Sequence, residues 1–114
     1  MNGNSSPNHS HKLNNLLPKQ VRKITDQLRD EIKRINDHPN EASGNALLYH
    51  SLAEEIDNVK EETCNPDVIN SLQNAADSLR KSENQAKKKL PNHEILPHLQ
   101  AANAELFASR NLRG

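Results

Sequence analysis

A stripe of side chains at heptad spacing, within residues 69–90, constrains the fold of this chain most strongly. Steps of three and four residues place all of its members on one face of a single helix, where small and branched apolar groups alternate. One member, Glu83, is acidic and interrupts the pattern. Because such a face suits packing against another helix, the stripe predicts a helical bundle. Its members are Ile69, Leu72, Ala76, Leu79, Glu83, Ala86 and Leu90.

A second stripe, with the clearest helical period in the chain, lies in the N-terminal third. We expect this first helix to begin between Asn14 and Pro18, since proline is tolerated in a first helical turn. It should end before Pro39, because the residue preceding a proline is pushed out of the helical region. The stripe consists of Leu17, Val21, Ile24, Leu28, Ile32 and Ile35.

Two further helices follow. The second is expected to start between Asp37 and Ser43, and the third to run from about Pro66 to Lys89 with Asn65 as its N-cap. The stripe of the second helix is widened on one side by three more residues. Its members are Leu48, Leu52, Ile56 and Val59, and the residues that widen it are Leu47, Tyr49 and Ala53.

The final helix is expected from about Pro97 to Leu112, with Ile95 packing from the preceding turn. Its inward positions are Leu99, Ala102 and Leu106. No segment shows the alternation of a strand. The chain therefore predicts an all-α fold, a small antiparallel bundle of three long helices and one shorter helix.

The bundle domain should span residues 13–114. Residues 1–12 are polar, lack an apolar period and are expected to form a flexible tail. The core is expected to contain one stripe from each helix: Val21, Ile24, Leu28, Leu48, Leu52, Ile56, Ile69, Leu72, Ala76, Leu99 and Leu106.

That core is thin. Leu, Ile, Val and Phe together make 24 of 114 residues, and Tyr49 and Phe107 are the only aromatic residues. A second copy would bury apolar area that one chain leaves exposed, so a homodimer is expected. The later part of the opening stripe is where contact with a second copy or another protein is expected: Leu79, Glu83, Ala86 and Leu90.

Glu83 has two interpretations. Ordinary surface pairs with Arg80 or Lys87 could satisfy its charge, and the core stripe would then end at Leu79. The alternative is a contact with a basic group on another helix or on a partner, which would help to fix the register of packing.

Charge is balanced overall but uneven along the chain. Residues 18–36 and 65–90 are basic, whereas residues 41–62 are acidic. An acidic segment between two basic ones favours an antiparallel arrangement. Zero net charge and the lack of aromatic platforms argue against nucleic-acid binding, and the lysines at 87–89 are interpreted as complementing a helix dipole.

No apolar run reaches the length of a membrane span, and the N-terminus lacks the layout of a secretory signal. Cys64 is the only cysteine, so no intrachain disulfide can form. An intermolecular Cys64–Cys64 bridge stays open. The chain is expected to be soluble and cytoplasmic.

Few residues resemble a reaction centre. His93 and His98 differ from a zinc-protease motif, which needs a spacing of four on a regular helix. Their spacing is five and Pro97 interrupts, so both are interpreted as loop histidines. His9 and His11 in the tail could bind a metal weakly. We expect no metal site, no cofactor and no enzymatic activity.

His50 lies within the second expected helix, as the phosphorylated residue does in histidine phosphotransfer domains. Those domains have a lysine and then a small residue or glycine soon after the histidine on the same helix. Here Ser51, Leu52, Ala53 and Glu54 follow, and an acidic neighbour would repel a phosphoryl group. Phosphotransfer is therefore the third choice of function.

The chain has 16 Asn among 114 residues, many Lys and His, and few aromatics. In this composition it resembles the small type IV-secreted effectors of intracellular bacterial pathogens. Within that group it is similar in size and helical plan to an inhibitor, or metaeffector, of ubiquitin-directed deamidases and transglutaminases. The resemblance implies secretion into a host cell without a cleaved signal. It also implies a non-catalytic protein-binding module that blocks a partner enzyme. The runner-up is an adaptor protein.

Overall fold

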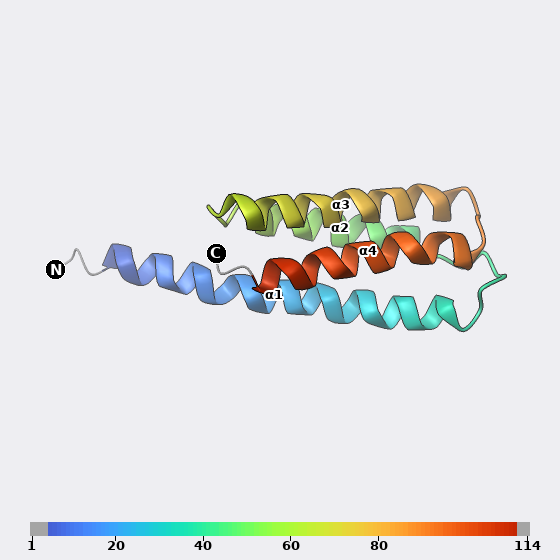
Figure 1. Ribbon diagram of the computed structural model, residues 1–114, viewed down its shortest axis with the longest axis horizontal. Coiled ribbons are helices and arrows are strands. Elements are labelled where there is room, and N and C mark those ends of the chain that lie inside the picture. The colour runs from blue at the N-terminus through green and yellow to red at the C-terminus, as the bar shows by residue number, and fades with distance from the viewer. Residues whose placement is uncertain (1–4, 112–114) are drawn as a thin grey trace.

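The computed structural model describes the backbone of residues 5–111 and the side chains of residues 18–110. Within these residues the chain folds into four α-helices and no strand: α1 (Ser5–Asn36), α2 (Ala46–Lys60), α3 (Pro66–Lys87) and α4 (Asn92–Asn111). Figure 1 shows that the chain reverses direction at each connection, so that successive helices run antiparallel. The predicted all-α fold is confirmed.

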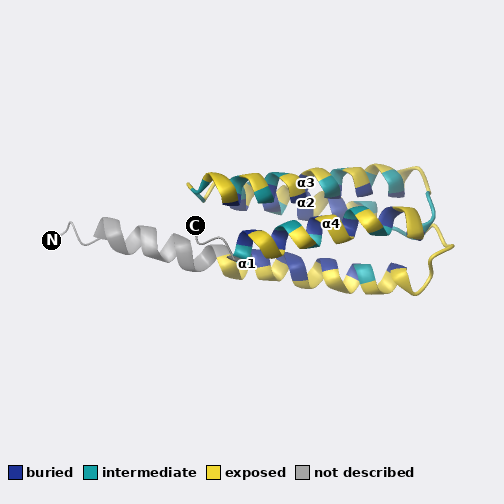
Figure 2. Ribbon diagram, in the orientation of Figure 1, coloured by how far each residue is buried: buried dark blue, intermediate teal, exposed yellow. Residues whose placement is uncertain are grey.

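The helices pack unequally on one another. The contacts of α3 with α4 and with α2 are the most extensive, whereas α1 lies against α4 and touches α2 more lightly. Buried residues line the inward faces of all four helices (Figure 2). Most of the expected core positions are fully buried, namely Val21, Ile24, Leu28, Leu52, Ile56, Leu72, Ala76, Leu99 and Leu106.

Two of the expected core residues are not buried. Leu48 is half-buried at the edge of the core, because α2 turns Tyr49 inward instead. In α3 the buried row begins at Val68, one residue earlier than the predicted Ile69, which is only half-buried. That row continues past Leu79, which was one possible end of the stripe, to Ser82 and Ala86. A core row two or three residues wide, rather than one ideal stripe, explains both shifts.

The helix boundaries also differ from the expected ones. Helix α1 begins at Ser5, before the predicted 14–18, so that Pro18 lies inside it. Residues 5–12, assigned to the flexible tail, are helical, and residues 1–4 lie outside the described part of the chain. Helix α2 begins later than expected because Asn45 caps it: Asn45 Oδ1 accepts a hydrogen bond from Leu48 N at 3.1 Å. It is α2, with 15 residues, that is shortest.

Helix α4 begins at Asn92, five residues before the predicted Pro97. A proline here removes one hydrogen bond of the helix. The helix nevertheless starts early because the loop between α1 and α2 supplies acceptors for its first donors. Asn92 N donates to Glu41 O at 2.7 Å, and His93 N donates to Pro39 O at 3.0 Å. In contrast, α3 begins as predicted, with Asn65 as its N-cap and Pro66 in its first turn.

Gly44 lies in the loop between α1 and α2, at a point where the backbone passes close to α3 and α4. A Cβ at this position would approach Ile95 Cδ1 to 2.7 Å, Ala86 Cβ to 3.2 Å and Tyr49 Oη to 3.3 Å. Only a residue without a side chain lets the backbone pass so close to α3 and α4. Gly44 thus lies in the loop that precedes α2 and not in the helix itself.

We expect Gly44→Ala to lower the free energy of unfolding by about 1–2 kcal/mol, because the added methyl overpacks a full core. Urea titration measures the change. In an Ile95→Val background the Cδ1 atom is absent, so the same substitution should cost less. Equal costs in the two backgrounds would contradict the proposed contact.

Lys89 lies in the turn that follows α3 and reverses the direction of the chain. Its φ is 60°, a left-handed conformation that favours glycine, and Leu90 N donates back to Gln85 O at 3.1 Å. This is a helix terminus of the Schellman type, in which a non-glycine residue is strained.

Lys89→Gly should therefore raise the free energy of unfolding by about 1 kcal/mol. Lys88 is the matched control, since its φ of −83° suits an ordinary side chain. Lys88→Gly is expected to leave stability unchanged or lower it. Thermal and urea unfolding of the two variants give the comparison, and a loss of stability in Lys89→Gly would refute the assigned strain.

Candidate functional site

The residues expected to contact a partner are divided between core and surface. Leu79 is fully buried within the monomer and Ala86 is 6% exposed, so neither is free to bind another molecule. Leu90 is half-buried in the connection between α3 and α4. Of the four residues, Glu83 alone takes part in a polar surface cluster. The expected contact surface along α3 is therefore wrong for Leu79 and Ala86.

Glu83 joins α3 to α2. Its carboxylate lies 2.9 Å from Lys87 Nζ and 3.3 Å from His50 Nδ1. Both interpretations of Glu83 hold in part, because it pairs with a lysine on its own helix and also with a basic group on another. Arg80 instead pairs with Asp57 of α2. The hydrogen bond from Lys87 and, less strongly, that from His50 lower the pKa of Glu83.

His50 lies between two carboxylates. Its Nδ1 faces Glu83, and its Nε2 lies 3.4 Å from Glu54 on the next turn of α2. A phosphoryl group on either ring nitrogen would therefore lie beside a negative charge, which is unfavourable. The arrangement instead suits a histidine that bridges two helices.

Leu47 stands beside this cluster. It was expected to widen the buried stripe of α2, but it is 83% exposed, because the first turn of α2 directs it away from the core. A shallow depression of about 240 Å³ lies at its base, lined by Ala46, Leu47, His50, Glu83 and Lys87. We call Leu47, His50, Glu54, Glu83 and Lys87 the α2–α3 patch.

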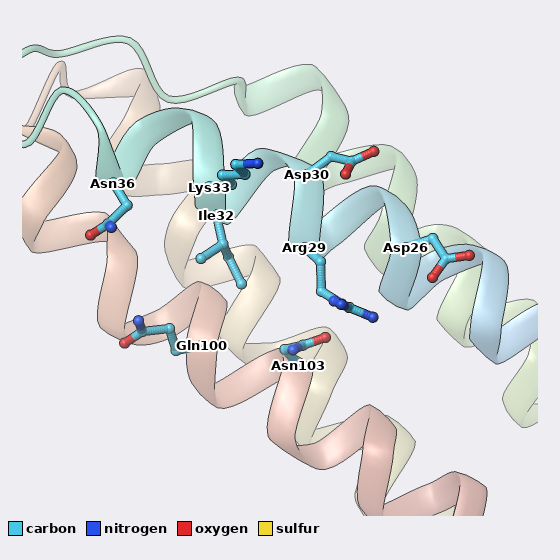
Figure 3. A pocket seen from close by; sticks show the side chains of 8 residues that line it. All are labelled: Asp26, Arg29, Asp30, Ile32, Lys33, Asn36, Gln100 and Asn103. Carbon is cyan, nitrogen blue, oxygen red and sulfur yellow. The ribbon is translucent and has the colours of Figure 1, made fainter.

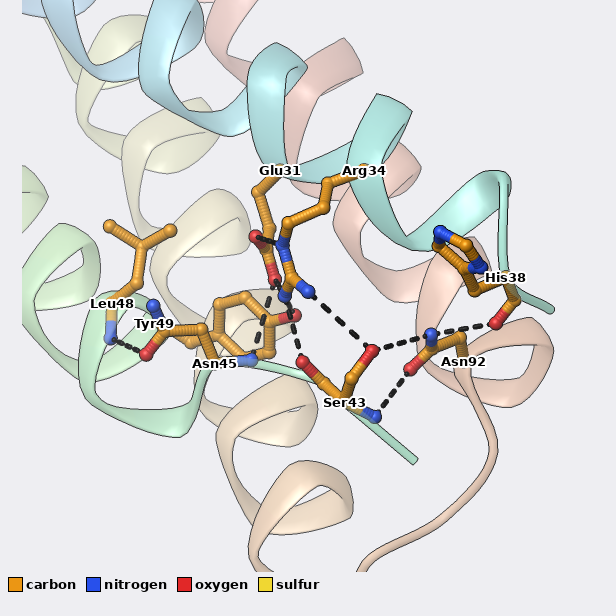
Figure 4. A network of polar contacts seen from close by, with 8 residues as sticks. All are labelled: Glu31, Arg34, His38, Ser43, Asn45, Leu48, Tyr49 and Asn92. Carbon is orange, nitrogen blue, oxygen red and sulfur yellow. Dashed lines mark hydrogen bonds and ion pairs between the residues drawn. The ribbon is translucent and has the colours of Figure 1, made fainter. Parts of the chain in front are cut away.

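A buried carboxylate fixes the start of α2 and hence this patch. Glu31 is 5% exposed and binds the guanidinium of Arg34 through two hydrogen bonds of 2.8 and 2.7 Å. Tyr49 Oη donates to Glu31 Oε2 at 2.6 Å, and Asn45 N donates to the same oxygen at 3.3 Å. The network therefore connects α1 to the N-cap and first turn of α2 (Figure 4).

Asn92 continues the network to α4. This fully buried side chain donates to His38 O at 2.8 Å and accepts from Ser43 N at 3.0 Å. Ser43 O in turn accepts from Arg34 Nη2 at 2.7 Å. Sequence reasoning missed both Glu31 and Asn92. One signal was available for Glu31, which lies three residues after Leu28 and four before Ile35, in register with the core.

The remaining candidate residues are the other histidines singled out in the sequence and Cys64. His93 and His98 lie in α4 rather than in a loop, and His98 Nδ1 is 3.1 Å from Gln85 Oε1 of α3. Cys64 is exposed. His9 and His11 lie outside the residues whose side chains are described. In the described part of the chain, no group of three potential ligands is arranged to hold a metal ion.

A groove also runs between α1 and α4. It has a volume of about 900 Å³ and a mixed lining that includes Arg29, Ile32, Gln100 and Asn103 (Figure 3). Asn103 Oδ1 is shielded from solvent and has no hydrogen-bond partner among the described residues.

Comparison with known proteins adds no relative: no family model, curated protein or solved structure matches this chain. Among the described residues, no helix is both long and apolar enough to cross a bilayer.

The buried Tyr49 hydroxyl should make stability fall at alkaline pH. Burial, followed by its hydrogen bond to the Glu31 carboxylate, raises the pKa of Tyr49 well above its usual range. Above about pH 10 the unfolded chain loses the tyrosine proton while the folded chain keeps it, so the unfolded state is favoured. Between about pH 8 and about pH 11, wild type should lose about 1 kcal/mol more than Tyr49→Phe.

Urea unfolding of both proteins at each pH measures this difference, and the other titrating groups are the same in both. Tyr49 is the only tyrosine and there is no tryptophan, so tyrosinate absorbance reports its ionisation directly. Equal losses in the two proteins, or tyrosinate in the folded state near pH 10, would contradict a protected hydroxyl.

Proposed function

We propose that this protein is a non-catalytic protein-binding module that binds a partner enzyme through the α2–α3 patch. One observation carries the proposal: Leu47 is 83% exposed beside a cluster of charged side chains. Among the described residues, Phe107 is the only other large apolar side chain that is exposed. A central apolar residue with a polar rim is the usual composition of a binding hot spot.

The position of Leu47 favours binding because its backbone is held in place. Asn45 caps the helix two residues earlier, and Glu31 accepts hydrogen bonds from both Asn45 and Tyr49 on either side of it. Little backbone entropy remains to be lost when a partner binds, which strengthens association. The polar rim of His50, Glu83 and Lys87 supplies orientation and specificity.

A projecting leucine fits a concave site that is mostly apolar, and enzyme active sites have this form. We therefore propose inhibition by occlusion of a partner's active or substrate site. The similarity in size and helical plan to a metaeffector makes ubiquitin-directed deamidases and transglutaminases the first enzymes to test. An adaptor role is the alternative, while the two carboxylates at His50 favour binding over phosphotransfer.

Leu47→Asp should weaken binding to such an enzyme by roughly 30–100-fold, since it removes an apolar anchor and introduces a charge. The fold should persist, because the side chain is exposed and an acidic residue is compatible with the first turn of a helix. Calorimetric titration measures affinity, and turnover of the enzyme measures inhibition.

Asn70→Asp is the matched control, because Asn70 is exposed on α3 more than three turns from Glu83. It adds the same charge and should bind like wild type. Stoichiometric loss of turnover on binding supports inhibition, whereas binding with unchanged turnover supports an adaptor. Undiminished binding of Leu47→Asp to its enzyme would refute the assigned surface.

A further inference from the structure

The outer face of α4 has no exposed charged residue over its central three turns, and the half-buried Glu105 lies at its edge. Its exposed residues in this stretch carry no charge: Pro97, Gln100, Ala101, Ala104, Phe107 and Ala108. The inner face of the same helix is apolar too, with Ile95, Leu99, Ala102 and Leu106 in the core. A helix that is apolar on both sides is normally covered on both sides.

The outer faces of the other helices differ. The exposed side of α1 between Lys19 and Lys33 carries seven charged residues, and that of α3 includes Asp67, Asp77 and Lys81. The uncharged outer surface is therefore a property of α4 and not of the whole bundle. Exposed apolar surface of this kind commonly marks an interface.

The α1–α4 groove adjoins this face. Its floor includes Ile32, and its α4 side presents Gln100 and Asn103 (Figure 3). Oδ1 of Asn103 is buried and has no hydrogen-bond partner among the described residues. Such atoms are rare in folded proteins, because leaving them unpaired costs free energy. Rotation of this amide toward the groove would let it accept a hydrogen bond from a second molecule.

Charges on the α1 side of the groove alternate in sign. Asp26, Arg29, Asp30 and Lys33 are exposed, and none of them forms an ion pair with another side chain that the structure describes. When two such helices run antiparallel, Asp26 of one copy lies opposite Lys33 of the other. In the same register Arg29 lies opposite Asp30.

The outer face of α4 is self-complementary in the same way. In an antiparallel pair of α4 helices, Pro97 lies opposite Ala108 and Ala101 lies opposite Ala104. The midpoint of this pattern lies between residues 102 and 103, and that of α1 between residues 29 and 30. Both midpoints fall at the level of the groove, which is lined by residues 26–36 and by Gln100 and Asn103.

We propose that the face formed by α1 and α4 binds a second copy of this chain, with like helices antiparallel across a two-fold axis. The small alanines let the two α4 helices approach closely, and the α1 helices contribute opposite charges at their edges. In this arrangement Gln100 of each copy lies near the unpaired Asn103 amide of the other. The expected homodimer therefore uses α4 in place of the buried α3 residues.

The dimer is expected to be weak. Residues 97–108 of a helix extend about 18 Å, so the contact falls at the low end of specific interfaces even with α1 included. Light scattering and sedimentation should show a monomer–dimer equilibrium with a dissociation constant of roughly 10–100 µM. A monomer mass up to about 1 mM would overturn the proposal.

Ala104→Glu places two like charges near the two-fold axis and should raise the dissociation constant at least tenfold. Asn74→Glu, on the exposed side of α3, is the control and should dimerise like wild type. Circular dichroism of both variants checks that the fold is kept. A dimer that persists in Ala104→Glu would place the interface elsewhere and overturn the assignment to α4.

A charge exchange tests the register. Asp26→Lys alone sets lysines opposite lysines and should weaken the dimer several-fold, in a manner that added salt reduces. Adding Lys33→Asp to Asp26→Lys restores opposite charges and should recover the wild-type dissociation constant. If the double variant stays as weak as the single one, the antiparallel pairing is overturned, because the exchanged charges face each other across the interface only in that register.

Discussion

The buried carboxylate of Glu31 is the interaction on which one end of the bundle depends. A charge removed from water is costly unless it is paired and hydrogen-bonded. Here Arg34 supplies the opposite charge, and Tyr49 and the Asn45 amide occupy the remaining acceptor sites. The carboxylate thereby sets the rotation of α2, since it draws Tyr49 into the core and leaves Leu47 outside.

That rotation places the packing residues and the exposed Leu47 on different sides of α2, the shortest of the four helices. The inward row of α2 supplies Leu52, Ile56 and Val59 to a thin aliphatic core, while its first turn bears Leu47 and His50 on the surface. The polar network thus specifies which of two adjacent leucines is presented to solvent. A buried polar group can contribute specificity of this kind even where its net contribution to stability is small.

The sequence predicted those features that depend on local periodicity. Four helices and most of the core followed from spacing, because a helix fixes which side chains share a face. The cap at Asn65 followed from residue type, since Asn is a favoured N-cap and Pro66 a favoured first helical residue. The surface role of Leu47 could not be read in this way, since a tertiary hydrogen bond from Tyr49 decides the rotation of α2. The early start of α4 depends similarly on carbonyl groups of a distant loop, which no local pattern around Pro97 reports.

The bonds of Asn92 also bear on how the chain folds. This residue closes a loop by binding Ser43 and His38, which precede it by 49 and 54 residues. Contacts so distant along the chain form only after much of the molecule has collapsed, because closing the intervening segment costs entropy. The connection between α1 and α2 is therefore completed by α4, a helix that is synthesised after it. A nascent chain that lacks α4 would have its hydrophobic stripes but not the ordered corner that exposes Leu47, so the proposed binding surface would form only once α4 has been made.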